Sequence, residues 1–220
     1  MSQKPSMNFL TRVYSVTVAS LVLLVAAPAP VAQAAVLHFH TFLSGLLEIP
    51  ANASPGTGTG DVYFDTVAHT LKVDLSWSGL LAGTTVAHIH APATAAQIVS
   101  AVPFAGTWGV ATQPGTLTGF PSGLTSGSYS GAPYSSLLVG SYTAGFLGAN
   151  GGTAALAEAA LLTYLHTGKA YLNIHSTAFP GGEIKGYLVP IPEPETYAML
   201  LAGLGLLGFV ARRRKQATAA

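Results

Sequence analysis

The sequence contains no cysteine, and only 8% of its 220 residues are charged. Without cysteine the chain has no disulfide bond, no thiolate metal ligand and no thiol nucleophile, so a hydrophobic core must stabilise any folded domain. The Gly-x-Ser-x-Gly elbow of serine hydrolases is also absent. The stretch PGTGTG, residues 55–60, lacks the lysine and the following helix of a phosphate-binding loop, and we interpret it as a flexible connection before a strand. These absences argue against nucleophilic catalysis and phosphate binding.

Positive charge is scarce between the two ends of the chain. The formal net charge of the whole sequence is +1, but residues 36–190 contain only three basic residues, Lys72, Lys169 and Lys185. Their acidic residues are Glu48, Asp61, Asp65, Asp74, Glu158 and Glu183. This central part is therefore net acidic and has no basic patch, which excludes nucleic acid as a partner.

The N-terminal end, residues 1–35, has the features of a secretory signal peptide. Lys4 and Arg12 precede and border an apolar run, residues 13–27, and small residues follow it. We expect cleavage at Ala34 or Ala35. The alternative is an uncleaved N-terminal anchor. Cleavage and export are the prediction, because the small-residue site follows the apolar run directly.

The C-terminal end combines a Pro-Glu-Pro motif, an apolar segment and a basic cluster. These are Pro192, Glu193 and Pro194, then residues 197–211, then Arg212, Arg213 and Arg214. A helix over residues 197–211 would be about 22 Å long, whereas the hydrocarbon core of a bilayer is about 30 Å thick. The segment therefore predicts only a short transmembrane helix. The basic cluster would stay on the cytoplasmic side.

These three elements, within residues 191–215, resemble the PEP-CTERM sorting signal of exported bacterial proteins. The resemblance implies export, transient membrane anchoring and cleavage near the Pro-Glu-Pro motif by a dedicated membrane protease. A plain C-terminal anchor with a basic stop-transfer segment is the alternative. Both place the central part outside the cytoplasm.

Short segments of alternating apolar and polar residues predict strands in the central part. They are residues 36–47, 61–65, 70–76, 84–90, 169–176 and 183–188. Residues 103–152, rich in Gly, Ser, Thr, Pro and Tyr, are too long for a structureless loop and should hold short strands or turns. Residues 153–166 predict one helix, which packs on a sheet. This pattern favours a mostly β fold, an antiparallel sandwich or barrel with one helix.

Histidines in strands are the main chemical signal. His88 and His90 share one face of a predicted strand, and Asn173 and His175 share one face of another. If His88, His90 and His175 converge, they form a three-nitrogen site for zinc or copper with an open position.

Other side chains could support this site, and a second pair of histidines has the same spacing. Glu183 could bind the metal or, like Asn173, orient a ligand from the surrounding layer. His38 and His40 form a second same-face pair on the first strand. The alternative to a metal site is that the histidines are structural and bond to backbone groups, with His175 bonding across to the strand of His88.

Three segments together resemble the CHRD domain, a family named after chordin. They are LSGLLEIP (residues 43–50), AHIHAP (residues 87–92) and GKAYLNIHSTAFPGGEIKGYL (residues 168–188). The resemblance spans residues 37–189, and we assign residues 36–190 to the domain. It implies an immunoglobulin-like β sandwich or barrel with no enzymatic activity generally attached. Lys185 stands where the family more usually has arginine.

A second similarity joins SGLLAGTTVAHIH to the strand of Cu,Zn superoxide dismutases that carries two copper ligands. It implies that His88 and His90 would be those ligands. The histidine-rich zinc loop and the cysteines of that family are missing here. The similarity therefore supports a dismutase much less than it supports a metal site.

The sequence thus predicts an exported, non-enzymatic CHRD-domain protein with a binding or structural role at the cell surface or in an extracellular matrix. Its expected partners are the export and sorting machinery, the membrane through the C-terminal helix, and an envelope or matrix polymer. The alternative function is a metal-binding protein or metalloenzyme that holds copper or zinc at a superoxide-dismutase-like histidine site.

Overall fold

The computed structural model describes residues 36–192 and 194–217. The predicted signal peptide with its cleavage site at Ala34 or Ala35 lies outside the described residues, as does Glu193 of the Pro-Glu-Pro motif. Within the described part, nine strands form one sheet with the main order β4-β7-β8-β1-β2-β3-β5. The strands are β1 (Val36–Ser44), β2 (Thr57–Asp65), β3 (Thr70–Ser78), β4 (Thr84–His90), β5 (Gly127–Ser130), β6 (Tyr134–Ser135), β7 (Tyr171–Ser176), β8 (Ile184–Tyr187) and β9 (Val189–Pro190).

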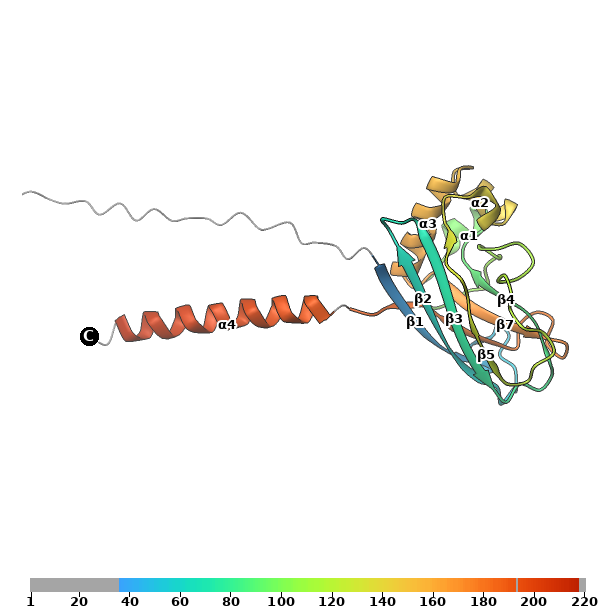
Figure 1. Cartoon of the computed structure of the whole chain (residues 1–220), viewed down its shortest axis with the longest axis horizontal. Coiled ribbons are helices and arrows are strands. Elements are labelled where there is room, and N and C mark those ends of the chain that lie inside the picture. Colours follow the sequence, from blue (N-terminus) through green and yellow to red (C-terminus); the bar gives the residue numbers. More distant parts are fainter. Residues whose placement is uncertain (1–35, 193, 218–220) are drawn as a thin grey trace, which may run out of the picture. The chain divides into compact units, whose positions relative to one another are not determined.

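The sheet is antiparallel and curls into a half-barrel. Figure 1 shows the long strands β1, β2 and β3 side by side, with β4 and β7 further round the curl. The recorded strand pairs, from β1 with β2 to β7 with β8, are all antiparallel. The prediction of a mostly β antiparallel fold is confirmed, in the form of this one curled sheet.

Strand β3 shows how the alternating sequence produces the two faces. Leu71, Val73 and Leu75 are buried, whereas Lys72 and Asp74 between them are half-buried on the outer face. Apolar side chains at every second position therefore point into the core and polar ones point away from it. The strand predicted over residues 84–90 is observed with these bounds as β4 (Thr84–His90).

The stretch PGTGTG was expected to be a flexible connection, and this was wrong. Strand β2 begins at Thr57, so Gly58 and Gly60 lie within the sheet. A Cβ at Gly60 would lie 2.4 Å from Cδ1 of Leu172 and 3.0 Å from Cδ2 of Leu75. The glycine is therefore required for close packing against the core and does not indicate flexibility.

The predicted helix of residues 153–166 is confirmed as α3 (Ala154–His166). Thr153 caps it, because its hydroxyl accepts a hydrogen bond from the backbone N–H of Leu156. The ring of His166 lies 5.1 Å from the ring of Phe39, which ties α3 to β1. Buried residues of the sheet and of α3 belong to one hydrophobic core.

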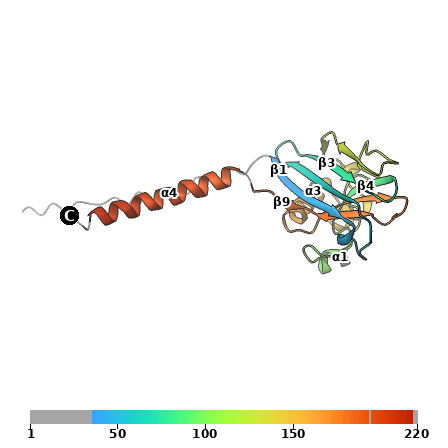
Figure 2. The same ribbon diagram turned by 90° about the horizontal axis from the view of Figure 1, so that it is seen from below.

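Residues 103–152 contain short elements, as predicted. They are β5, β6, the 3-10 helix η2 (Val139–Ser141) and the helix α2 (Ala144–Ala149). A second short helix outside the prediction is α1 (Ala95–Ser100), and a 3-10 turn η1 (Gly45–Leu47) ends the first predicted strand early. Figure 2 shows α1 as a short helix at the edge of the domain. Thr94 and Thr143, which cap α1 and α2, were the signals available in the sequence.

The same segment also covers the free edge of β4. The backbone N–H of Ala111 donates to the carbonyl oxygen of Ile89 at 2.9 Å, and that of Leu117 donates to the carbonyl oxygen of Ala87 at 2.9 Å. Because an exposed strand edge leaves backbone groups unpaired, this covering completes the hydrogen bonding of β4. It also brings residues 108–115 next to the histidines of that strand.

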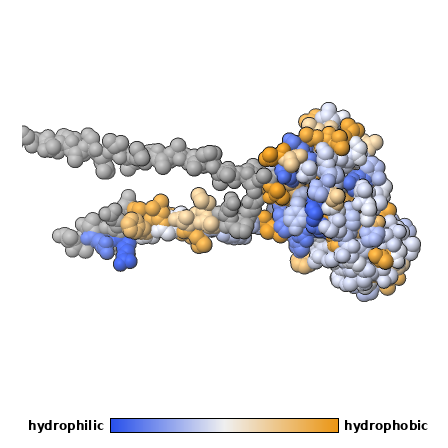
Figure 3. Space-filling view, in the orientation of Figure 1, coloured by the Kyte–Doolittle hydropathy of each residue, from blue (hydrophilic) through white to orange (hydrophobic). Residues whose placement is uncertain are grey.

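The C-terminal segment forms one helix, α4 (Pro194–Ala217), of 24 residues. Its surface is hydrophobic along much of its length and hydrophilic near its C-terminal end (Figure 3). In residues 36–192 and 194–217, no helix is long and apolar enough to cross a membrane. The predicted helix is present, but the prediction that it is a transmembrane helix is not confirmed.

Candidate metal centre

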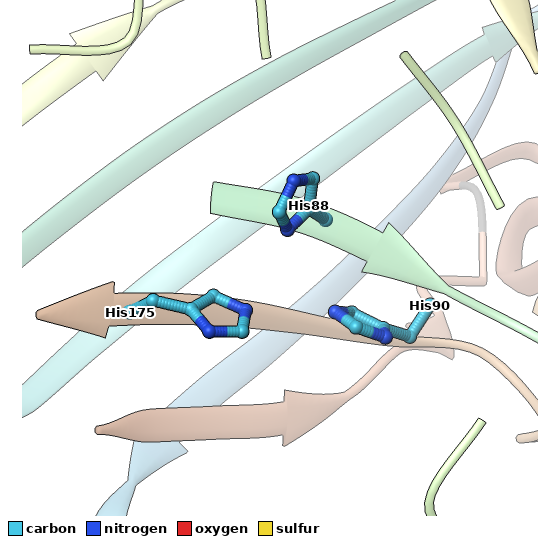
Figure 4. A group of neighbouring side chains, drawn as sticks. All are labelled: His88, His90 and His175. Atoms are coloured by element: carbon cyan, nitrogen blue, oxygen red, sulfur yellow. The ribbon is translucent and has the colours of Figure 1, made fainter. Parts of the chain in front are cut away.

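Three histidines from two neighbouring strands converge on one point. Strand β4 provides His88 and His90, and β7 provides His175. In the antiparallel register His88 lies opposite Asn173 and His90 opposite Tyr171, so His175 is the next residue along the same face. One ring nitrogen from each histidine lies within 4.8 Å of the other two. Figure 4 shows the rings of His90 and His175 pointing toward each other, with the ring of His88 beside them.

The three side chains are buried, with relative exposures of 6%, 7% and 8% for His88, His90 and His175. Each ring has one nitrogen bound to a backbone carbonyl oxygen. The pairs are His88 Nε2 with Gly115 at 2.8 Å, His90 Nδ1 with Trp108 at 2.9 Å and His175 Nδ1 with Pro180 at 2.9 Å. A carbonyl oxygen can only accept, so each of these nitrogens carries the proton and donates.

The other nitrogen of each ring therefore carries a lone pair when the imidazole is neutral. These atoms, His88 Nδ1, His90 Nε2 and His175 Nε2, are buried and have no hydrogen-bond partner among the described residues. A buried acceptor without a partner costs about 1–3 kcal/mol, so three of them facing one another need an explanation. Neutral imidazoles oriented by a hydrogen bond at the other nitrogen are the usual donors to a metal ion in proteins.

Burial keeps the three rings neutral. Desolvation lowers the pKa of His88 and of His175, and it lowers the pKa of His90 to about 3, although each bond to a carbonyl acts in the opposite direction. At neutral pH the centre therefore offers three lone pairs and needs to release no proton when it binds a cation.

Aromatic packing fixes the orientation of His90. Its ring stacks on Tyr171 with centroids 4.8 Å apart and an angle of 6° between the planes. The Tyr171 hydroxyl donates to the carbonyl oxygen of Trp108, the same oxygen that accepts from His90. The segment before β5 thus holds both rings, which gives a role to residues 108–115.

Asn173, predicted to support the ligands, lies on the same face of β7 between Tyr171 and His175. Its Oδ1 atom is buried without a hydrogen-bond partner in the described part of the chain. A Cβ at Gly182 would lie 2.5 Å from Asn173 Nδ2 and 2.9 Å from Glu48 Oε1. Gly182 therefore allows the amide and the carboxyl group to approach the same point, and its φ of +127° also favours glycine.

Glu183, the other predicted supporting residue, makes its recorded contacts elsewhere. Its Oε1 atom accepts from the Ser54 hydroxyl at 2.6 Å and from the backbone N–H of Leu81 at 2.6 Å. The carboxylate is fully buried and ties these two loops to the start of β8. The described contacts thus connect Glu183 to loops and not to the histidines.

Two charged residues near the centre were not predicted. Lys185 is only 1% exposed, and its Nζ donates to the carbonyl oxygen of Gly106 at 3.2 Å. Burial lowers the pKa of Lys185 and raises that of Glu48 to about 7, while the attraction between the two groups opposes both shifts. The available signal was a lysine between Ile184 and Gly186 in an apolar strand, which alternation alone would place in solvent.

The second predicted histidine pair lies apart from this centre. His38 Nε2 and His40 Nδ1 contact the same carboxylate oxygen, Asp61 Oδ1, at 2.7 and 2.9 Å. Burial acts to raise the pKa of Asp61, but the hydrogen bonds from the two imidazoles outweigh it and the pKa is lowered. These side chains are a quarter to a third exposed, so this pair forms a hydrogen-bonded cluster with Asp61 on the outer face.

Comparison with protein families identifies two regions of the chain. Residues 39–188 match the model of the CHRD domain, and residues 190–215 match the PEP-CTERM protein-sorting motif. The three converging histidines, with Asn173, Glu48 and Lys185, all fall within the first match. Searches of curated proteins and of solved structures found no match.

Proposed function

Since the chain belongs to the CHRD domain family and ends in a PEP-CTERM protein-sorting motif, we propose that it is an exported, non-enzymatic protein that binds a metal ion at His88, His90 and His175. The sorting motif supports export and a location at the cell surface or outside the cell. The function of the domain there is binding, and copper or zinc is the ligand that its donor atoms fit best.

The single observation that carries this proposal is the direction of the three lone pairs. Each imidazole donates a hydrogen bond from one ring nitrogen to a backbone carbonyl, and its other nitrogen faces the point that the three rings share. Histidines that served only to hold loops would need no common orientation of their second nitrogens. Three neutral nitrogen donors match the ligand number of many protein-bound zinc and copper ions.

Metal analysis of the purified full chain tests the proposal. After incubation with copper or zinc and removal of free metal, we expect about one equivalent bound to the wild-type protein and none to the His88→Ala variant. The matched control is His38→Ala, which alters the other His-x-His pair and should keep the metal. A wild-type protein that retains no metal and shows no thermal shift with copper or zinc contradicts the proposal.

A structural role of the histidines is a second candidate, and one observation favours it. The three bonds to backbone oxygens attach the segments of Gly115, Trp108 and Pro180 to strands β4 and β7. In that case His175→Ala lowers the stability of the domain by about 1–3 kcal/mol whether or not metal is added. With a metal site, the loss is larger in the presence of metal than in its absence.

The C-terminal segment of the chain suggests where the protein acts. We propose that α4 anchors the protein transiently and that processing near Pro192 and Pro194 releases the CHRD domain, which can then contact an envelope or matrix polymer. Cell fractionation and intact mass of the released form test this step. Full-length protein found in the cytoplasm with both ends intact contradicts it, whereas replacement of Arg212, Arg213 and Arg214 by alanine should retard processing.

A further inference from the structure

The metal centre combines neutral donor atoms with a positively charged neighbouring side chain. The donors are neutral, and no carboxylate in residues 36–192 forms a recorded hydrogen bond or ion pair with His88, His90 or His175. The charged side chain whose field acts on His90 is Lys185, a cation. The three ligands thus supply no negative charge to a metal ion, and an ammonium group packs against Tyr171, the ring on which His90 stacks.

Lys185 packs against two aromatic rings, one of which also holds His90. Its Nζ atom lies 4.7 Å from the centroid of the Tyr171 ring and 5.5 Å from that of Tyr187. His90 stacks on the same Tyr171 ring at 4.8 Å. Glu48 attracts Lys185, while burial raises the pKa of Glu48 to about 7. The described contacts thus place the positive charge of Lys185 on the same aromatic ring that packs against His90.

On these grounds, and building on the proposed function, we propose that the centre selects copper(I) over zinc(II) and copper(II). The cost of taking an ion out of water rises with the square of its charge, so a divalent ion costs about four times as much as a monovalent ion of similar size. Neutral imidazoles do not offset the second charge, and the lysine opposes it. Copper(I) is the monovalent ion of this series and is stable with three nitrogen donors.

The coordination number points the same way. Zinc in proteins is almost always four-coordinate, so it would need a fourth ligand besides the three histidines. The nearby unpartnered acceptor on this face, Asn173 Oδ1, is neutral and would not compensate for the charge of a divalent ion. Three buried nitrogens satisfy copper(I) without an added anion.

The test measures affinities of the full chain for each ion. Copper(I) is titrated under reducing, oxygen-free conditions in competition with a chromophoric copper(I) chelator, and zinc(II) and copper(II) with their own indicators. We expect the copper(I) complex to be at least tenfold tighter than the zinc(II) complex. Equal or tighter binding of zinc(II) overturns the inference and leaves the proposed function intact, while failure to bind any of the three ions overturns both.

Substitution of the lysine tests the electrostatic cause. Coulomb energy is proportional to the charge of the ion, so removing one positive charge should change the logarithm of the zinc(II) affinity twice as much as that of copper(I). For Lys185→Met we expect about tenfold tighter zinc(II) and about threefold tighter copper(I). Lys185→Arg, which keeps the charge, and Lys72→Met, which removes the charge paired with Asp74 on the outer face, should leave both affinities unchanged.

An equal change for both ions in Lys185→Met, or no change, contradicts the role of the lysine. If that variant does not fold, which circular dichroism reveals, the wild-type comparison of copper(I) with zinc(II) still decides the selectivity.

Discussion

The chain contains the pattern His-x-His twice, and the two copies have different surroundings. His38 and His40 on β1 lie on the outer face of the sheet and share one oxygen of Asp61. His88 and His90 on β4 are buried and donate to backbone carbonyls. Both pairs obey the same strand geometry, which puts residues i and i+2 on one face. The difference therefore comes from what lies opposite each ring.

The chemistry of the partner decides what each pair can do. A carboxylate oxygen accepts hydrogen bonds from both outer rings, and so the outer pair forms a hydrogen-bonded cluster with Asp61. A carbonyl oxygen accepts a hydrogen bond without supplying a negative charge, and burial disfavours the protonated ring, so the inner pair stays neutral with one lone pair per ring. With His175, the inner pair becomes a set of metal donors. The following predictions test this contrast, from the largest expected effect to the smallest.

Acid should destabilise the metal-free protein through the inner cluster. The pKa of His90 is about 3 in the folded state against 6.5 for the free side chain, so between these values the unfolded chain binds the extra proton. Stability is therefore fully present above pH 6.5 and falls as the pH falls. We expect the contribution of His90 to stability to fall by about 3 kcal/mol between pH 7 and pH 4. Urea denaturation with a chelator present measures it as the difference between wild type and a His90 variant.

The His90→Gln variant isolates this contribution. Glu48 acts in the opposite direction, because its pKa is raised to about 7 and the folded state holds its proton between pH 4.5 and 7. The difference between wild type and His90→Gln at each pH cancels the effect of Glu48. Parallel pH profiles for the two proteins would contradict the assignment of a buried neutral His90. Asp61 has a lowered pKa, so the outer cluster should lose its contribution only in stronger acid.

Metal should stabilise the domain through the inner cluster alone. Since the ion binds only the folded state, a free concentration of 100 times the dissociation constant adds about 2.7 kcal/mol to the free energy of unfolding. Thermal melts should shift upward with copper or zinc and return on chelation. We expect the shift in wild type and in His40→Ala and its loss in His90→Ala. A shift that survives in His90→Ala would locate the ion elsewhere.

The sequence predicts the strands that carry the two His-x-His pairs, but it does not predict the different surroundings of these pairs. The bounds of β4 follow from Gly79, which ends the preceding strand, and from Pro92, which follows β4. The convergence of His88, His90 and His175 follows from the alternation of side chains along the strands and from the resemblance to the CHRD domain. The partners of the rings do not, because the carbonyl oxygens of residues 108 and 115 belong to a Gly- and Ser-rich segment without periodicity. Any residue can provide a backbone oxygen, so no side chain in that segment marks it.

Lys185 and Glu48 illustrate the same limit for charges. Alternation places a charged residue of a strand in solvent, yet Lys185 is buried because residues near Gly106 cover that face of β8. Glu48 lies after the turn η1, where local sequence says nothing of depth. Tertiary contacts between distant segments produced both positions, and only the structure reveals them.

Truncation should separate the two clusters even without metal. His175→Ala removes the bond to the Pro180 carbonyl and leaves that oxygen and a small cavity behind, which should cost about 2 kcal/mol. His38→Ala removes a partly exposed ring and should cost less than about 1 kcal/mol. Chemical denaturation of the two variants with a chelator present makes the comparison. Equal losses would show that the outer ring, which stacks on Tyr63, matters as much as the buried one.

Asp61→Asn gives the smallest expected effect and the most direct test of the outer cluster. The amide keeps the shape of the side chain and removes the charge that two imidazoles share. Because these groups are a quarter to a third exposed, the loss in stability should be about 0.5 kcal/mol near neutral pH, and it should shrink further in high salt. Metal affinity should stay as in wild type, since Asp61 has no recorded contact with the inner histidines. A weakened metal site in Asp61→Asn would mean that the two His-x-His pairs are coupled through β1 and that the contrast between them is not local.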